Sequence, residues 1–341
     1  MSESASERHG RLVGIKLRAL AADHLGRTID ADPEPFAPGA ALAVGRSAWV
    51  FLETDPDRRL GSAVAWTIRH DADELNVVAE SGTGTLARRA AEFTIPITVW
   101  HAEGRVLLPA VAEPIAPPIP ADPDHLRFNE LIVEAGATPV VEHGVVSGEV
   151  RGLEVCRVVA DPDLGTIRLE VGVGRPDREA FQLIHGDVPP VEALARVVDA
   201  VTKYRSADVP LHPLNRVARE RFLRWQLEQD PALVGALSLE PVAPPLPRRN
   251  VNDVGACSAI GPAASGQTIL AVCSTGVDLD VIPYAADARL AATGGRSVAA
   301  APGVVGGELH VVVVLPSRDL VSLTHDLAAR LVQPVELVSF D

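Results

Sequence analysis

Two stretches of the chain, residues 47 to 101 and residues 268 to 340, alternate continuous apolar runs with amphipathic segments of about ten residues. Continuous apolar runs are typical of parallel strands buried on both faces, and the segments between them have the length of crossover helices. The pattern predicts a three-stranded parallel βαβαβ unit in each stretch, with right-handed crossovers. We therefore expect an α/β fold in which two βαβαβ Rossmann-like halves at the termini flank a different, central α+β module.

The segment between the two halves has another pattern. Closely spaced strands with Gly turns follow a helical stretch around Glu130, and further helical stretches continue to Gln229. This spacing favours an antiparallel or mixed sheet covered by helices. The two terminal halves also resemble each other in amino-acid sequence and in the lengths of their predicted elements. Either an internal duplication or the shared physics of α/β units explains that likeness.

Two proline-rich segments, Pro109 to Pro123 and Glu240 to Asn250, predict the domain boundaries. Such composition favours extended, semi-rigid spacers. The predicted organisation is a Rossmann-like βαβαβ domain with an N-terminal arm over residues 1–108, a linker over 109–124, the α+β module over 125–239, a second linker over 240–264, and a second Rossmann-like βαβαβ unit over 265–341.

Composition narrows the classes of function. A net charge of −14 argues against a protein that coats nucleic acid through a general positive field. The three cysteines, Cys156, Cys257 and Cys273, stand far apart without metal-ligand spacing, so we expect free thiols in a reducing compartment. No apolar run reaches the roughly 18 residues of a membrane span, and the N-terminus lacks an apolar core. We therefore expect a cytoplasmic protein without a membrane partner.

The stretch Thr268 to Leu290 reads as an apolar strand, a small-residue turn and an alanine-rich helix. Ligands of α/β proteins usually lie beyond the carboxyl end of such a strand. Ser274, Thr275 and Gly276 follow the strand, where their backbone amides are candidates to bind an anion at the helix N-terminus.

Three aspartates follow in the same stretch. Asp278 and Asp280 lie two residues apart, and Asp287 comes two helical turns later. Carboxylates are the ligands that Mg²⁺ and Mn²⁺ prefer, so all three are candidate metal ligands, with Asp278 and Asp280 also catalytic. The alternative is structural: Asp280 caps the helix, and Asp287 pairs with Arg289 or with solvent.

The N-terminal half has a comparable loop. Gly82, Thr83 and Gly84 precede a helix that carries Arg88 and Arg89, a composition that suits a phosphate-binding loop. A Gly/Thr loop that only caps its helix explains the same residues.

The central module carries further candidate groups. Glu154, Glu170, Asp177 and Arg178 are candidate catalytic residues, and a helix followed by acidic strands is similar to the core of PD-(D/E)xK nucleases. The lysine of that motif, two residues after the carboxylate, is absent, because Glu170 is followed by Val171 and Gly172, and the chain is not assigned to the family. Charged residues on a half-exposed sheet give the same pattern.

Arg221 and Arg224 lie on the last helical stretch of the module and are candidates to bind phosphate. The alternative for this helix is an ordinary exposed ion-pair ladder.

Two classes of function stay open. The first is a metal-dependent phosphoester hydrolase, acting on a phosphate-bearing small molecule or a nucleic-acid end. The second is a non-catalytic nucleotide- or anion-binding or protein-interaction module. A dehydrogenase and a serine hydrolase are disfavoured, because the chain has no GxGxxG after an opening strand and no GxSxG. A homo-oligomer is compatible with either class.

Overall fold

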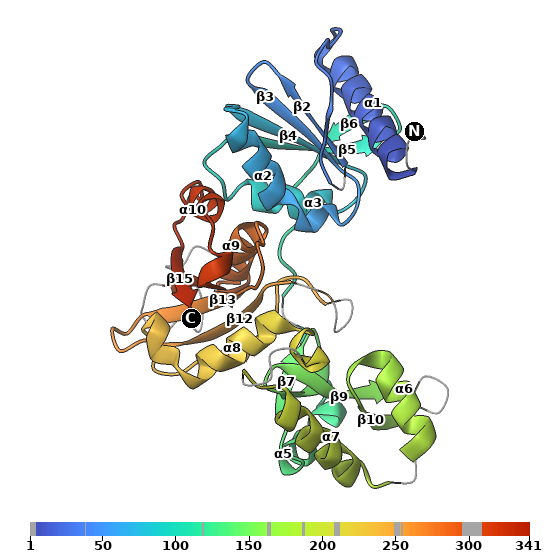
Figure 1. Cartoon of the computed structure of the whole chain (residues 1–341), viewed down its shortest axis with the longest axis vertical. Helices are drawn as coiled ribbons and strands as arrows, with labels where there is room; N and C mark the ends of the chain where they lie inside the picture. Colours follow the sequence, from blue (N-terminus) through green and yellow to red (C-terminus); the bar gives the residue numbers. More distant parts are fainter. Residues whose placement is uncertain are drawn as a thin grey trace. The chain divides into compact units, whose positions relative to one another are not determined.

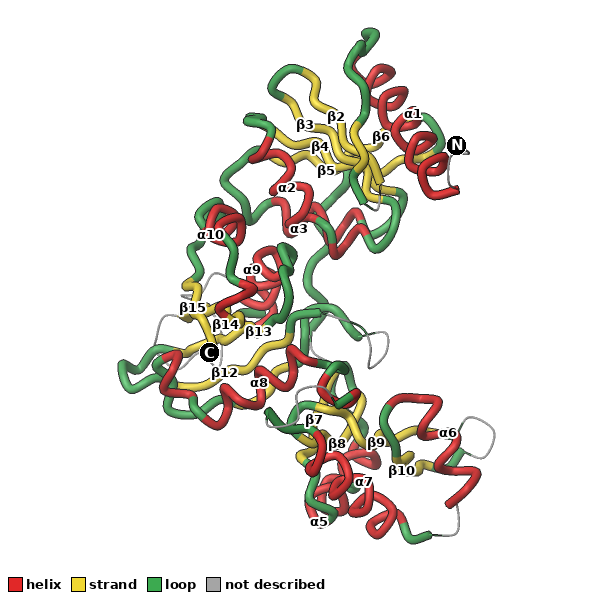
Figure 2. Tube along the Cα trace, viewed as in Figure 1, coloured by secondary structure: helices red, strands yellow, loops and turns green. Residues whose placement is uncertain are grey.

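The computed structural model describes residues 5–37, 39–117, 119–161, 165–185, 188–207, 212–248, 253, 255–294 and 309–341. These residues form a mixed α/β fold with three sheets (Figures 1 and 2). The chain divides into two compact units. Unit 1 comprises Met1–Ile115, Val277–Leu290 and Arg318–Glu336, and unit 2 comprises Ala116–Gly276, Ala291–Ser317 and Leu337–Asp341.

The sheet of unit 1 has six strands in sequence order: β1 (Glu34–Pro35), β2 (Gly39–Val44), β3 (Ser47–Leu52), β4 (Glu74–Ala79), β5 (Ile97–Glu103) and β6 (Val106–Pro109). The three strands β3, β4 and β5 pair in parallel, which confirms the parallel pairing predicted for residues 47 to 101. The outer strands β1, β2 and β6 pair antiparallel, so the sheet is mixed.

Three helices of unit 1 cover this sheet: α1 (Ala5–Leu25), α2 (Leu60–Arg69) and α3 (Thr83–Ala90). The helix α1 lies on one face, with α2 and α3 on the other (Figure 1). Leu17 and Leu20 of α1 pack against Trp49 and Phe51 of β3 in one buried cluster. Burying each such side chain contributes about 1.5–3 kcal/mol. The predicted N-terminal arm is thus a helix held by the sheet.

The first half of unit 2 is the predicted α+β module. Its sheet is antiparallel in the order β10-β9-β8-β7, and its elements are α4 (Pro123–Leu126), α5 (Asn129–Glu134), β7 (Thr138–Glu142), β8 (Val145–Val150), β9 (Leu153–Ala160), β10 (Ile167–Val171), α6 (Gly174–His185) and α7 (Pro190–Tyr204). Apolar residues of α5 and α7, among them Ile132 and Leu194, pack with the strands in a separate core. The expected sheet covered by helices is confirmed.

The third sheet contains β11 (Glu240–Val242), β12 (Cys257–Pro262), β13 (Thr268–Cys273), β14 (Leu309–Pro316) and β15 (Glu336–Phe340), in that order. The strands β13 and β14 are parallel, whereas β12 pairs antiparallel with both β11 and β13. The helix α8 (Arg219–Gln229), which the sequence groups with the central module, packs on β12 and β13 through Leu223 and Leu227. The predicted second linker contains β11.

The order of elements is repeated. The series α1, β1, β2, β3, α2, β4, α3, β5 recurs as α8, β11, β12, β13, α9 (Val281–Ala292), β14, α10 (Ser322–Ala328), β15. The antiparallel pairing of the first three strands and the parallel pairing that follows also recur. The likeness of the two series therefore extends from amino-acid sequence to strand direction. It includes a helix at the start of each series, which favours internal duplication.

Corresponding segments of the two series meet within unit 1. The residues after α3 and after α10 form an antiparallel bridge at Phe93 and Leu331. The Thr94 amide donates to the Arg330 carbonyl at 2.7 Å, and the Val332 amide donates to the Glu92 carbonyl at 2.8 Å. In addition, α2 contacts α10, and α3 forms ion pairs with α9. Within unit 1, each of these helices thus contacts the helix of the other series that is not its equivalent.

Candidate functional site

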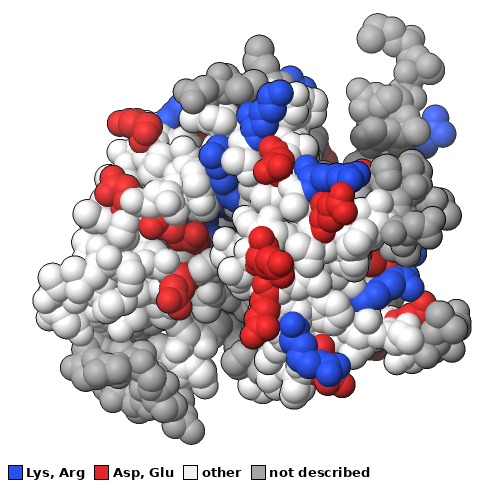
Figure 3. All heavy atoms as spheres, turned by 90° about the horizontal axis from the view of Figure 1, so that it is seen from below, with Lys and Arg blue, Asp and Glu red and all other residues white. Residues whose placement is uncertain are grey.

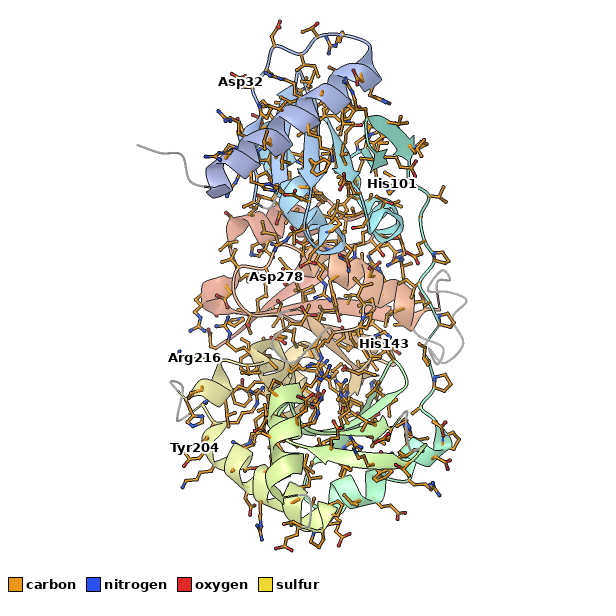
Figure 4. The ribbon with its side chains drawn as sticks, turned by 90° about the vertical axis from the view of Figure 1, so that its right-hand side faces the viewer. Asp32, His101, His143, Tyr204, Arg216 and Asp278 are labelled. Atoms are coloured by element: carbon orange, nitrogen blue, oxygen red, sulfur yellow. The ribbon has the colours of Figure 1, made fainter. Side chains whose placement is uncertain are left out.

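Three segments that are far apart in the sequence converge in unit 1. They are the loop after β3, which contains a short 3₁₀ helix (Pro56–Arg58), the loop that precedes α3, and the segment that leads into α9. Arg89 of α3 donates to the Asp57 carbonyl, and Gly61 of α2 donates its amide to Asp280 Oδ1 at 3.0 Å. The structure therefore brings the Gly82 loop and the Asp278 loop, two separate candidates in the sequence, into one region. Figure 4 labels Asp278.

Asp278 and Asp280 are both tied to backbone amides. The Asp280 amide donates to Asp278 Oδ1 at 3.0 Å, so Asp278 forms the turn that opens α9. Asp280 accepts from Gly61 at the start of α2. The approach is close, because a Cβ on Gly61 would lie 2.1 Å from the Leu279 carbonyl oxygen. The sequence missed Gly61, since only a tertiary contact requires a glycine there.

The electrostatic surroundings of Asp280 oppose its ionisation. The pKa of Asp280 is raised to about 7, mainly by burial and also by the neighbouring charge of Asp278, while the Gly61 amide and the charges of Arg89 and Arg59 act in the opposite direction. A carboxylic acid in this position therefore holds a proton at mildly acidic pH.

We expect the stability of unit 1 to fall as pH rises through 7. The folded pKa of Asp280 is above its unfolded value near 3.8, so the stabilising contribution is fully present below that value and is lost through about pH 7. After allowance for solvent screening, the loss between pH 5 and pH 8 is roughly 1–2 kcal/mol. In urea unfolding, the Asp280→Asn variant should not show this loss of stability with rising pH. It should be more stable than the wild type at pH 8.

The variant Asp278→Asn is the control for this prediction. It removes the neighbouring charge and leaves Asp280 titratable, so the loss should move to lower pH. If the free energy of unfolding depends on pH equally in the wild type and in Asp280→Asn, the assignment of this loss of stability to Asp280 is contradicted.

The third candidate ligand, Asp287, is fully buried and bound by two arginines of α3. Arg88 donates to it through Nε at 2.9 Å and through Nη2 at 3.1 Å, and Arg89 donates through Nε at 2.6 Å. Both carboxylate oxygens thus accept hydrogen bonds from guanidinium groups. The structural alternative paired Asp287 with Arg289 or with solvent, whereas in the structure it pairs with Arg88 and Arg89, the arginines that follow the candidate phosphate-binding loop.

The glycine loop before α3 is packed by other residues of unit 1. A Cβ on Gly82 would lie 3.2 Å from the Asp57 Cβ, and one on Gly84 would lie 2.7 Å from the Glu113 Cβ. The Glu113 amide donates to the Gly84 carbonyl at 3.0 Å. Thr83 is the first residue of α3. At Gly82 and Gly84 the loop therefore packs against other residues of unit 1.

The candidate anion-binding residues Ser274, Thr275 and Gly276 belong to unit 2. Ser274 is buried and donates its amide to the Val314 carbonyl at 3.2 Å. The Thr275 hydroxyl is buried and has no hydrogen-bond partner among the described residues. The geometry does not test whether these residues bind an anion, so that role stays a prediction.

The candidate catalytic groups of the central module bind one another. Arg178 donates to Glu154 Oε1 at 3.0 Å and lies 3.4 Å from Glu170 Oε2. Arg157 donates two further hydrogen bonds to Glu154, both at 2.9 Å. Asp177 accepts from the Val173 amide at 2.6 Å at the start of α6. These side chains form a closed ion-pair cluster and a helix cap.

Arg221 and Arg224 are buried, with their guanidinium groups bound to carboxylates of the central sheet. Arg221 donates to Glu149 at 2.6 Å and to Glu142 at 2.7 Å, and Arg224 donates to Glu149 at 2.7 Å. Burial by itself raises the pKa of Glu149, but the charges of Arg224 and Arg221 outweigh it and hold that pKa at about 2. The two arginines bind carboxylates of their own chain, and no phosphate role is tested.

Further observations concern metals, membranes and cysteines. Within the described ranges, no three His, Cys, Asp or Glu side chains are grouped so that a metal ion fits between them. Among those same residues, no helix combines the length and apolar character that a membrane span requires. Cys156, Cys257 and Cys273 are free and buried, as predicted. On the face drawn in Figure 3, the acidic and basic side chains shown are interspersed.

No family model, curated protein or solved structure matches the chain. The assignment of a function therefore depends on the side chains of the site itself.

Proposed function

We propose that this chain is a non-catalytic protein-interaction module. One observation supports this proposal above all others: most of the charged candidate side chains form ion pairs within the chain, and the carboxylates of Asp278 and Asp280 accept hydrogen bonds from backbone amides. Asp287 is held by Arg88 and Arg89, Glu154 by Arg178 and Arg157, and Glu149 by Arg221 and Arg224. A buried carboxylate between two guanidinium groups is already neutralised, and replacing an arginine with a metal ion would leave that arginine buried without a partner.

The metal-dependent hydrolase remains the competing hypothesis. It requires Asp278 and Asp280 to share a Mg²⁺ or Mn²⁺ ion and Asp287 to exchange its arginines for the same ion. The two hypotheses differ in their response to metal, because a ligand that binds only the native state raises the melting temperature.

We expect MgCl₂ and MnCl₂ to leave the melting temperature of the protein unchanged. A genuine site at 100 times its Kd would stabilise the native state by about 2.7 kcal/mol, which is easily measured by differential scanning fluorimetry. The double variant Asp278→Asn with Asp280→Asn should respond to metal as the wild type does, and neither should hydrolyse bis-p-nitrophenyl phosphate with either metal.

The matched control replaces two exposed aspartates at the same spacing, Asp71→Asn with Asp73→Asn. A metal-dependent rise in melting temperature that the first double variant loses and the control keeps would refute the interaction module at this site and establish the metal-dependent enzyme.

A further inference from the structure

A groove of about 810 Å³ lies in unit 1 beside the N-terminal half of α1. Val13, Gly14 and Ile15 form its helical wall, and the proline-rich segment that includes Pro33 and Phe36 forms the opposite wall. Its volume is within the range of about 300–1,000 Å³ that is usual for binding sites. The Ile15 side chain is 49% exposed at this surface. The groove is therefore an apolar hollow open to a ligand.

Two glycines one helical turn apart shape the groove. A Cβ on Gly14 would lie 2.9 Å from the Pro33 Cβ, so this glycine lets the proline-rich segment approach α1. A Cβ on Gly10 would meet nothing within 4 Å. The space beside Gly10 is open, and a larger side chain at that position would occupy the groove without displacing the protein.

Charged pairs border the hollow at both ends. His9 Nε2 lies 2.7 Å from Glu53 Oε2, and Arg18 donates to Asp32 at 3.2 Å. The Asp32 side chain, labelled in Figure 4, is 93% exposed. An exposed pair of this kind contributes little stability, so a carboxylate of a ligand can take the place of Asp32 on Arg18.

The repeated element order identifies an equivalent position in unit 2. In unit 1, Gly14 of α1 lies beside Ala40 at the start of β2, and His9 reaches Glu53 just after β3. In unit 2, the Glu220 carbonyl of α8 accepts from Cys257 at the start of β12, at 3.3 Å. Each helix thus lies against the start of the second strand of its own sheet, β2 or β12. The surface of α8 that corresponds to the groove is the one that carries Arg221 and Arg224.

That surface of α8 is occupied by polypeptide. The turn between β8 and β9 lies against α8, where a Cβ on Gly152 would be 2.3 Å from the Arg221 carbonyl oxygen. Glu149, next to this turn, accepts from both Arg221 and Arg224. The Arg151 guanidinium carbon lies 5.1 Å from the centre of the Trp225 ring. A hairpin end with a carboxylate beside it therefore fills the position in unit 2 that is open in unit 1.

We propose that the groove on α1 binds a hairpin or loop of a partner protein, in which apolar side chains lie beside a carboxylate. The inference rests on the proposed function, since it names the partner that the interaction module would bind. The apolar side chains of the partner pack against Ile15 and Phe36, and its carboxylate binds Arg18. The central sheet of the chain itself provides the example for the carboxylate, because Glu149 beside the hairpin turn binds Arg221 and Arg224 of α8.

The probe for this proposal is a cyclised synthetic peptide of residues 142–157 with Cys156→Ser, the hairpin that fills the equivalent position on α8. In the full-length protein the α8 position is already occupied, so the peptide has only the α1 groove to fill. Fluorescence anisotropy should show binding of one peptide per chain. We expect Gly10→Leu, which fills the groove, and Ile15→Asp, which charges it, each to weaken binding by about tenfold or more.

Two controls accompany the probe. The protein variant Val106→Asp changes a residue of β6 that is 57% exposed and does not line the groove, so binding should be retained. A peptide in which Glu142, Glu149 and Glu154 are all replaced by Gln should bind several-fold more weakly to the wild-type protein, because it lacks a carboxylate for Arg18.

Three results would overturn the inference: no binding of the peptide, equal binding by Gly10→Leu and the wild type, or a groove that binds the dye anilinonaphthalene sulfonate while rejecting the peptide. The last result would assign the groove to a small apolar molecule. None of the three depends on metal. If the peptide test fails and MgCl₂ leaves the melting temperature unchanged, only this inference is refuted and the proposed interaction module is not. A rise in melting temperature with metal would instead refute the proposed function.

Discussion

The variant Asp287→Asn should lose about 3–5 kcal/mol of the free energy of unfolding of unit 1. Arg89 is 2% exposed and Arg88 is 10% exposed at the side chain, and both donate to the Asp287 carboxylate. Asparagine keeps the size of the side chain but removes the charge, which leaves two guanidinium groups without their carboxylate. Removing one partner of a buried ion pair costs this much because the remaining charge stays desolvated.

Hydrogen exchange measured by mass spectrometry separates this loss from any effect on unit 2, because peptides from α2 and α3 report on unit 1 alone. The control is the triple variant Asp287→Leu with Arg88→Met and Arg89→Met, which removes all three charges together. Apolar replacement of a whole buried ion pair is often nearly neutral, so the triple variant should recover much of the lost stability. If it is no more stable than Asp287→Asn, packing and not charge accounts for the effect.

The variant Glu149→Gln should destabilise unit 2 by about 3 kcal/mol. Glu149 is 3% exposed, and it is the common acceptor of Arg221 and Arg224, each 1% exposed at the side chain. The folded pKa of about 2, against an ordinary value of 4.5, corresponds to roughly 3 kcal/mol at neutral pH. Because the folded pKa is lowered, this contribution is present above about pH 4.5 and is lost as the pH falls through 2.

The matched control in the same unit is Glu170→Gln. The Glu170 side chain is 20% exposed, and its partner Arg178 keeps a hydrogen bond to the more deeply buried Glu154. We expect the control to lose less than about 1 kcal/mol, as partly exposed pairs do. Exchange in α8 and β8 measures both variants. Equal losses would mean that burial does not set the strength of these pairs.

The two predictions depend on ion pairs that no local pattern in the sequence indicates. Arg88, Arg89, Arg221 and Arg224 have the composition of phosphate-binding residues, and nothing local distinguishes that role from an internal one. Their partners are far away along the chain: Asp287 is 199 residues from Arg88, and Glu149 is 72 residues from Arg221. Charge pairing at such separation is a property of the fold, so no pattern within a single helix or loop reveals it.

The sequence by itself determined the local structure of this protein. Alternating apolar runs and amphipathic segments predicted the parallel strands β3 to β5, and close strand spacing predicted an antiparallel or mixed central sheet, which is antiparallel in the structure. Both sheets follow from which side chains are buried, and the local order of apolar and polar residues indicates which side chains these are. The likeness of the two terminal halves was likewise visible in the order and length of their segments.

Only the tertiary structure decided which charges meet and which surfaces stay open. The place of α8 on the third sheet, the close approach of Gly61 to Leu279, and the groove beside Gly10 all depend on contacts between distant segments. Such contacts are set by the packing of whole elements, and a glycine in the sequence looks the same whether a backbone crowds it or open space surrounds it. For that reason the sequence identified the residues of the candidate site, and the fold determined what each of them binds.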